Sequence, residues 1–268
     1  MKRLLITIDG STNDYTSLMS AMQLTRRLGA ELSVVYTALP PEAFYGFAET
    51  TAPVVFDNTE DAKVAAERAR TAYDTACAEW PGAEWSTTEH LGADAIARLG
   101  PLADLVIMER LSQEEGPSAA GFNAALFEGA GPVFIVPPEP KPTIATTPVI
   151  AWNGSREAAL AVKSAMALLQ LAGRVTVLSG DDESSGNLSS LMKYLGAYGV
   201  TMAVERFSSD QMTARGRARA LLKASEDLSA DLLVMGGYGE NAISALFGLG
   251  RATRKIVTAA RMPVLLHH

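Results

Sequence analysis

The sequence contains the same pattern twice, and this internal repeat constrains the fold more than any other feature. The stretch RLLITIDGSTNDYTSLMSAMQLTRRLGAELSVVYT, beginning at Arg3, matches TPVIAWNGSREAALAVKSAMALLQLAGRVTVLSG, beginning at Thr147. Each copy has an apolar run, a turn of Asp or Asn followed by Gly-Ser, a helix-period segment, a glycine and a β-branched run. Later, ADLVIM matches ADLLVM, and GPVFIV matches MPVLLH. The repeat therefore predicts two related halves.

The halves are joined by PPEPKPTIATTP, residues 137–148, whose prolines exclude a helix or a central strand. We place one domain at residues 1–139 and the other at 147–268. In each, short apolar runs alternate with amphipathic stretches, as in parallel strands wrapped by helices. For the second half we expect strands at 148–152, 175–179, 200–206, 231–235 and 263–267. The sequence thus predicts an α/β protein with two tandem, doubly wound parallel sheets of five strands each.

The expected fold also places a site. In doubly wound sheets, ligands bind at the carboxyl ends of the strands, where the strand order reverses. With the order 3-2-1-4-5, that point in the second half lies between the strands that precede Asn153 and Gly236. Gly10-Ser11 and Gly154-Ser155 stand at strand-to-helix turns, and we expect both serines to supply an N-cap oxygen.

On these motifs the whole chain resembles the universal stress protein family in its tandem two-domain form. The resemblance rests on ITIDGS and IAWNGS at the first strand ends, ADLVIM and ADLLVMGGYG at the fourth, and PVFIV and PVLLH at the last. It implies that adenosine packs near the end of strand one and that phosphates lie on a Gly-x-x-Gly loop after strand four. It also implies that the terminal edges of the halves pair, which would make the chain an intramolecular pseudo-dimer. Whether two chains then associate stays open.

The second half matches the nucleotide-binding pattern of that family in part. By resemblance the site contains Asn153 in place of an aspartate, and Gly236 and Gly239 in the loop. The next glycine comes one position late, as Gly250, and Arg251 stands where Ser or Thr is expected. With their neighbours, the candidate nucleotide-binding residues are Trp152, Asn153, Met235, Gly236, Gly239, Gly250, Arg251, Ala252 and Thr253.

The chemistry of this loop suits an anion. Glycine lets the backbone approach a ligand closely, and the helix start after Gly250 offers unsatisfied amides with a partial positive charge. Arg251 can add a charge-assisted contact. The alternative is that the glycines only solve turn geometry and that Arg251 and Lys255 form a solvated face.

The first half lacks this pattern. Glu109, Glu114 and Glu115 stand where the glycine loop would be, and carboxylates repel a triphosphate. We expect Asp9 to cap its turn through Ser11 and Thr12, and this half to be structural or to bind something uncharged.

Composition narrows the function classes. A net charge of −7 argues against nucleic acid as a partner, and no apolar run approaches membrane-spanning length. The single cysteine, Cys77, favours a reducing compartment, so we expect a cytoplasmic protein with Cys77 as a packed thiol. We expect a polar role rather than catalysis for His90, and His267 and His268 could be frayed. The acidic loop at 180–186 is typical of a solvated turn, or it lines the mouth of the predicted pocket. The aromatic loop at 39–56 either covers its own core or forms a lid, a partner surface or a lipophilic pocket wall.

Two function hypotheses follow. The first is a stress-response module whose C-terminal half binds ATP or AMP, with Mg²⁺ only if ATP is bound, and which acts through unidentified protein partners. The second is a nucleotide-independent scaffold. No nucleophile, histidine and acid form a catalytic set, so enzymatic activity would be at most that of a slow ATPase.

Overall fold

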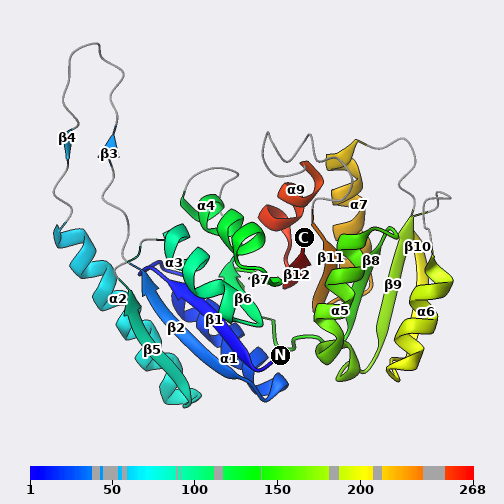
Figure 1. Cartoon of the computed structure of the whole chain (residues 1–268), viewed down its shortest axis with the longest axis horizontal. Helices are drawn as coiled ribbons and strands as arrows, with labels where there is room; N and C mark the ends of the chain where they lie inside the picture. The colour runs from blue at the N-terminus through cyan, green and yellow to red at the C-terminus, as the bar shows by residue number, and fades with distance from the viewer. Residues whose placement is uncertain are drawn as a thin grey trace, which may run out of the picture.

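One large sheet runs through both halves of the chain (Figure 1). The computed structural model describes residues 1–37, 43–44, 54–55, 59–88, 90, 92–111, 117–139, 141–180, 187–207, 213–237 and 251–268. The strands are β1 (Arg3–Ile8), β2 (Glu31–Thr37), β3 (Ala43–Phe44), β4 (Val54–Val55), β5 (Ala83–Thr88), β6 (Leu105–Glu109), β7 (Val133–Val136), β8 (Pro148–Trp152), β9 (Val175–Gly180), β10 (Met202–Phe207), β11 (Leu232–Gly236) and β12 (Val264–His267). The helices are α1 (Asp14–Leu28), α2 (Thr59–Glu79), α3 (Gly92–Leu99), α4 (Pro117–Asn123), α5 (Arg156–Gln170), α6 (Leu188–Ala197), α7 (Ala214–Asp227) and α9 (Arg251–Ala259), with short helical turns η1 (Gly100–Leu102) and η2 (Ala124–Glu128).

The order of the sheet confirms the predicted fold class. Ten strands lie in the order β10-β9-β8-β11-β12-β7-β6-β1-β2-β5, and β3 and β4 form a separate pair. Within each half the strands are parallel and follow the order 3-2-1-4-5. The bounds expected for the second half agree within one or two residues, because strands buried on both faces read as unbroken apolar runs.

The two halves meet edge to edge. β7 pairs antiparallel with β12, with Phe134 opposite Leu265, and Figure 1 shows the halves side by side around this seam. An isolated half would leave either strand as an exposed apolar edge, which natural sheets avoid. The expected pairing of the closing strands is therefore present within the chain.

Hydrophobic cores lie on both faces of the sheet. Residues of α1, α2, α5 and α6 pack on one face, and residues of α3, α4, α7 and α9 pack on the other. Alternation along the strands divides the side chains between the faces: Leu4 and Ile6 belong to the first core, and Leu5 belongs to the second. Each core draws on both halves of the chain.

An aspartate in each half holds the start of the first strand. The Asp231 carboxylate accepts hydrogen bonds from the Thr146 and Thr147 amides, both at 2.8 Å. Asp104 does the same for the amides of Lys2 and Arg3, and these two bonds lower the pKa of Asp104. The aspartate of the repeated Ala-Asp-Leu motif thus has a structural role in each half, which the sequence pattern did not indicate.

We expect Asp231→Ala to lower the free energy of unfolding by about 2 kcal/mol, since two backbone amides lose their acceptors at a buried position. Urea denaturation measures this. The matched change Asp104→Ala should cost less, because Asp104 is exposed and water can replace its carboxylate. Equal costs at the two sites would contradict this account.

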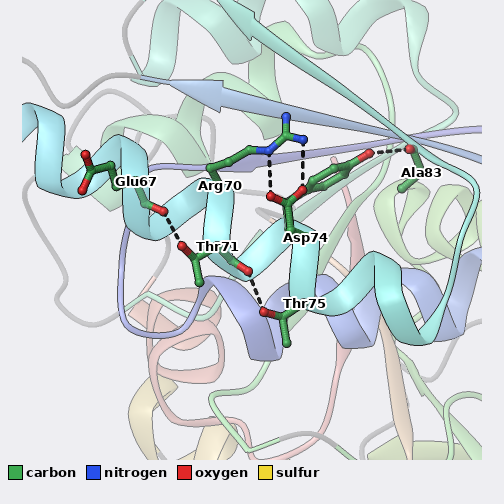
Figure 2. Close-up of polar contacts among 7 residues, drawn as sticks. Glu67, Arg70, Thr71, Asp74, Thr75 and Ala83 are labelled. Carbon is green, nitrogen blue, oxygen red and sulfur yellow. Dashed lines mark hydrogen bonds and ion pairs between the residues drawn. The ribbon is translucent and has the colours of Figure 1, made fainter.

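Helix α2 is fastened to the sheet edge at β5. The Tyr73 hydroxyl donates a 2.7 Å hydrogen bond to the Ala83 carbonyl. On the exposed surface of α2, Arg70 pairs with Asp74, and Thr71 and Thr75 donate to carbonyls one turn earlier (Figure 2). The Arg70 guanidinium also lies over the ring of Trp85, 5.2 Å from its centroid.

Two local expectations are wrong. Ser11 is not the N-cap of α1: that helix begins at Asp14 after Asn13, and the Ser11 hydroxyl accepts from the Asn13 amide instead. The carboxylate of Asp14 accepts a 2.8 Å hydrogen bond from the Gly10 backbone amide and closes the turn before the helix. The exclusion of a central strand from residues 137–148 fails at Pro148, which is the first residue of β8, where a missing N–H is tolerated; the strand expected at 148–152 is confirmed.

Candidate functional site

The crevice predicted to hold a ligand lies between β8 and β11, which are neighbours in the sheet. Helix α5 follows β8 on one face of the sheet, and α9 lies on the other face beyond the end of β11. The strand order therefore reverses here, as the sequence indicated. Trp152 ends β8, Asn153 follows it, and Met235 and Gly236 end β11, so the fold brings these four predicted residues to adjacent strand ends.

The turn after β8 is built around Asn153. Its Oδ1 accepts a 3.1 Å hydrogen bond from the Ser155 amide, and Gly154 has a positive φ of 76°. The Ser155 hydroxyl accepts from the Ala158 amide and caps α5, as expected. Asn153 itself is exposed, so a neutral amide is accessible at the end of β8.

Gly236 is required by packing as well as by its place in the site. A Cβ there would lie 2.5 Å from the Ala158 nitrogen and 2.6 Å from the Glu157 carbonyl carbon, both in the first turn of α5. The end of β11 and the start of α5 thus approach more closely than any side chain permits. Trp152 and Met235 are buried at the ends of β8 and β11.

The rest of the predicted site is described only in part. Gly239 and Gly250 lie outside the described residues, as does the side chain of Arg251, whose backbone begins α9. In the first turn of α9, Ala252 is half-buried and Thr253 is buried. The glycine loop stays a prediction.

The matching crevice of the first half is occupied by carboxylates. Glu109 ends β6 where Gly236 ends β11, and it accepts hydrogen bonds from the Ser11 hydroxyl, at 3.3 Å, and from the Asn13 amide group. Asp9 accepts from the Ser11 amide at 3.0 Å, as predicted. Glu109, which the sequence placed where the glycine loop would be, therefore connects the end of β6 to the turn that follows β1.

Asp14 completes this acidic crevice, and the sequence analysis missed it. Its side chain is buried, with 3% exposed, and accepts from the Gly10 amide and from Ser11 Oγ at 3.2 Å. Burial, followed by the negative charges of Asp9 and Glu109, raises the pKa of Asp14 to about 7. Asp14 follows the Gly-Ser turn in a position typical of an exposed first helical turn, so no local signal indicated its burial.

The other candidates have local roles. His90 pairs with Asp94 at 3.0 Å on an exposed surface, a contact that the sequence analysis did not identify. Cys77 is a partly buried free thiol against the core, as expected. Residues 181–186 lie outside the described residues, as do the side chains of residues 39–56, where β3 and β4 form a short antiparallel pair.

His267 is held rather than frayed. Its Nδ1 lies 2.7 Å from the Ser164 hydroxyl of α5. Burial lowers the pKa of His267, while a hydrogen bond with the Leu160 backbone acts in the opposite direction. Besides the Ser164 hydroxyl, His267 thus contacts a backbone group of α5. These two contacts fix the end of β12 and do not form a catalytic triad.

Across the described ranges, no three His, Cys, Asp or Glu side chains are arranged to hold a metal ion. Nor, in that part of the chain, does any helix combine the length and apolarity needed to cross a membrane.

Known structures share this fold. No protein-family model and no curated protein matches the chain. A universal stress protein from Archaeoglobus fulgidus DSM 4304 is 15% identical, with a TM-score of 0.69 over 99% of this chain and 95% of that one. A provisionally assigned universal stress protein from Pseudomonas aeruginosa UCBPP-PA14 is 13% identical, with a TM-score of 0.60 over 100% and 93%. The cytoplasmic domain of a prokaryotic cation chloride cotransporter is 13% identical, with a TM-score of 0.51 over 99% and 94%.

The chain therefore has the fold of tandem universal stress proteins, which confirms the resemblance drawn from its motifs at the level of the fold. The same architecture also serves a transporter domain, so function has to be argued from the site.

Proposed function

We propose that the chain is a universal stress protein-like module whose C-terminal half binds one adenine nucleotide, ATP or AMP, and whose N-terminal half binds none. It senses the nucleotide and passes the signal on through protein contacts. Mg²⁺ would enter only with ATP, and turnover would be at most that of a slow ATPase.

The contrast between the two matched crevices carries this proposal. In the first half, Asp9, Asp14 and Glu109 gather at the strand ends and would repel phosphates. In the second half the equivalent strand ends carry a neutral amide at Asn153 and a glycine at Gly236. A nucleotide therefore meets the smaller electrostatic barrier in the second half.

Helix α9 supports the same assignment. It begins at Arg251, directly after the glycine-rich segment that ends with Gly250. The first amides of a helix have no acceptor within the helix, and together with the helix dipole they favour a bound phosphate.

Isothermal titration with ATP and AMP tests the proposal. We expect binding by the natural chain and a loss of about tenfold in affinity for Asn153→Ala, since a hydrogen bond to the nucleoside is lost. The matched control is Asp9→Ala. Asp9 makes the same turn contact as Asn153, so both changes disturb their turns equally, but only Asn153 belongs to the proposed site.

A loop variant gives the second arm of the test. Deleting Leu249 and changing Arg251 to Ser restores the family spacing. If the natural chain gives no heat at millimolar nucleotide and the loop variant does, the natural protein is a nucleotide-independent scaffold. Equal losses for Asn153→Ala and Asp9→Ala would also contradict the proposed site.

A further inference from the structure

A pocket lies between the first half of the chain and the linker. Its volume is about 350 Å³, and its lining includes Gln23, Arg26 and Arg27 of α1, Trp80 after α2, and Thr143 of the linker. We call it the junction pocket. The last turn of α1 precedes the start of β2, and the linker leads to the start of β8, so the pocket lies at the amino ends of the strands. It is thus separate from the crevice at Asn153 and Gly236.

Arg27 ties the halves together at this pocket. One guanidinium nitrogen donates both to the Ala145 carbonyl of the linker, at 3.0 Å, and to the Leu171 carbonyl at the end of α5, at 2.7 Å. Its Nε is buried without a hydrogen-bond acceptor among the described residues. A buried donor of a charged group that lacks an acceptor is costly. A negative charge bound in the adjoining pocket would offset this cost, because solvent screens the attraction between charges only in part at a partly buried site.

Arg26 adds a second positive charge. Its guanidinium lies over the Trp80 ring, 4.6 Å from the centroid, on the exposed side of the pocket. Within the described part of the chain, neither Arg26 nor Arg27 has a carboxylate at salt-bridge distance. Arg70, which lies over Trp85 in a similar way, is neutralised by Asp74. The two guanidiniums of the junction pocket differ from Arg70 in lacking such a counter-charge among the described residues.

From these contacts we propose that the junction pocket binds the phosphate group of a small molecule. Arg26 provides a guanidinium fork whose geometry fits phosphate oxygens, and Arg27, which bonds to two backbone carbonyls, adds a positive charge beside it. The Gln23 side chain donates to the Pro142 carbonyl and holds the linker against α1, and Thr143 offers a hydroxyl. Because Arg27 bonds to the linker and to α5, phosphate binding here stabilises the contact between the halves. This site stands whether or not the second half binds a nucleotide.

The test is a titration with inorganic pyrophosphate at constant ionic strength, followed by the fluorescence of Trp80, with Trp80→Phe used to assign the signal. We expect saturable binding by the natural chain and a loss of about tenfold in affinity for Arg26→Gln, since one charge-assisted contact is lost. Arg26 is exposed and holds no other part of the chain by a side-chain hydrogen bond within the described residues, so this variant should fold. Arg27→Gln should abolish binding.

Two controls make the result specific. Arg70→Gln removes a similar stacked arginine whose charge is already neutralised, and its affinity should equal that of the natural chain. Arg251→Ala, which removes a positive charge from the proposed phosphate end of the nucleotide crevice, should also leave pyrophosphate binding unchanged, which separates this site from that crevice. A response that does not saturate, or equal losses for Arg26→Gln and Arg70→Gln, would overturn the proposal. If Arg27→Gln fails to fold, Arg26→Gln still decides it.

Discussion

Replacing Asp14 with asparagine is expected to raise the free energy of unfolding at about pH 8 by about 4 kcal/mol. In the folded chain, burial together with Asp9 and Glu109 raises the pKa of Asp14 from 3.8 to about 7. The folded state therefore binds a proton more tightly than the unfolded chain does. The contribution of the protonated Asp14 carboxyl to the free energy of unfolding is complete below about pH 4, and it is lost as the pH rises through 7. Asparagine keeps an acceptor for the Gly10 amide and never ionises, so the variant avoids this loss.

Urea denaturation at about pH 4 and about pH 8 measures the effect, because the difference between the natural chain and Asp14→Asn should be small at the lower pH and large at the higher one. Asp227→Asn is the matched control. Asp227 pairs with Lys223 on the surface, where such a pair contributes little. Stability curves for the natural chain and Asp14→Asn that run parallel across this range would show that the carboxyl is not strained by burial.

Gly10→Ala is expected to destabilise the chain by about 3 kcal/mol, from two causes that add. Gly10 has a φ of 87°, where an L side chain is strained. A Cβ there would also lie 2.3 Å from the Ala65 carbonyl oxygen of α2, a backbone atom that cannot move aside. The clash would push α2 away from the turn that carries Asp9 and Asp14.

Gly29→Ala separates the two causes. Gly29 also has a positive φ, of 57°, but a Cβ there meets nothing within 4 Å. This control should cost about 1 kcal/mol from backbone strain alone. Thermal or urea unfolding of both variants measures the difference, which is the cost of the clash with α2. Equal losses would mean that α2 can retreat freely from the turn.

The strands and their order could be predicted because the chain repeats itself and because buried parallel strands are apolar throughout. VIAW in β8 and LLVM in β11 contain no polar position that would confuse their limits. The turn at Asn153 and the cap at Ser155 were also predictable, since both depend on contacts within a few residues.

The acidic crevice was predictable only in part. Glu109 was visible as a departure from the glycine pattern, but its bonds to Ser11 and Asn13 arise only when β6 pairs with β1. The approach of α2 to the same turn, with Ala65 against Gly10, was likewise indicated by no local pattern.

The junction pocket left no local signal at all. Arg26 and Arg27 look like the ordinary basic last turn of a helix, and only the path of the linker past α1 makes them line a pocket. The glycine loop between β11 and α9 stays a prediction from the family resemblance.

The stoichiometry of nucleotide binding tests the central claim most directly. Equilibrium dialysis of the intact chain against labelled ATP, with the nucleotide then released by denaturation and counted, should give one nucleotide per chain. It should also give one for Asp9→Ala, because carboxylates close the first-half crevice and Asp9 plays no part in binding. No bound nucleotide at millimolar ATP, or two per chain, would contradict the division of labour between the halves.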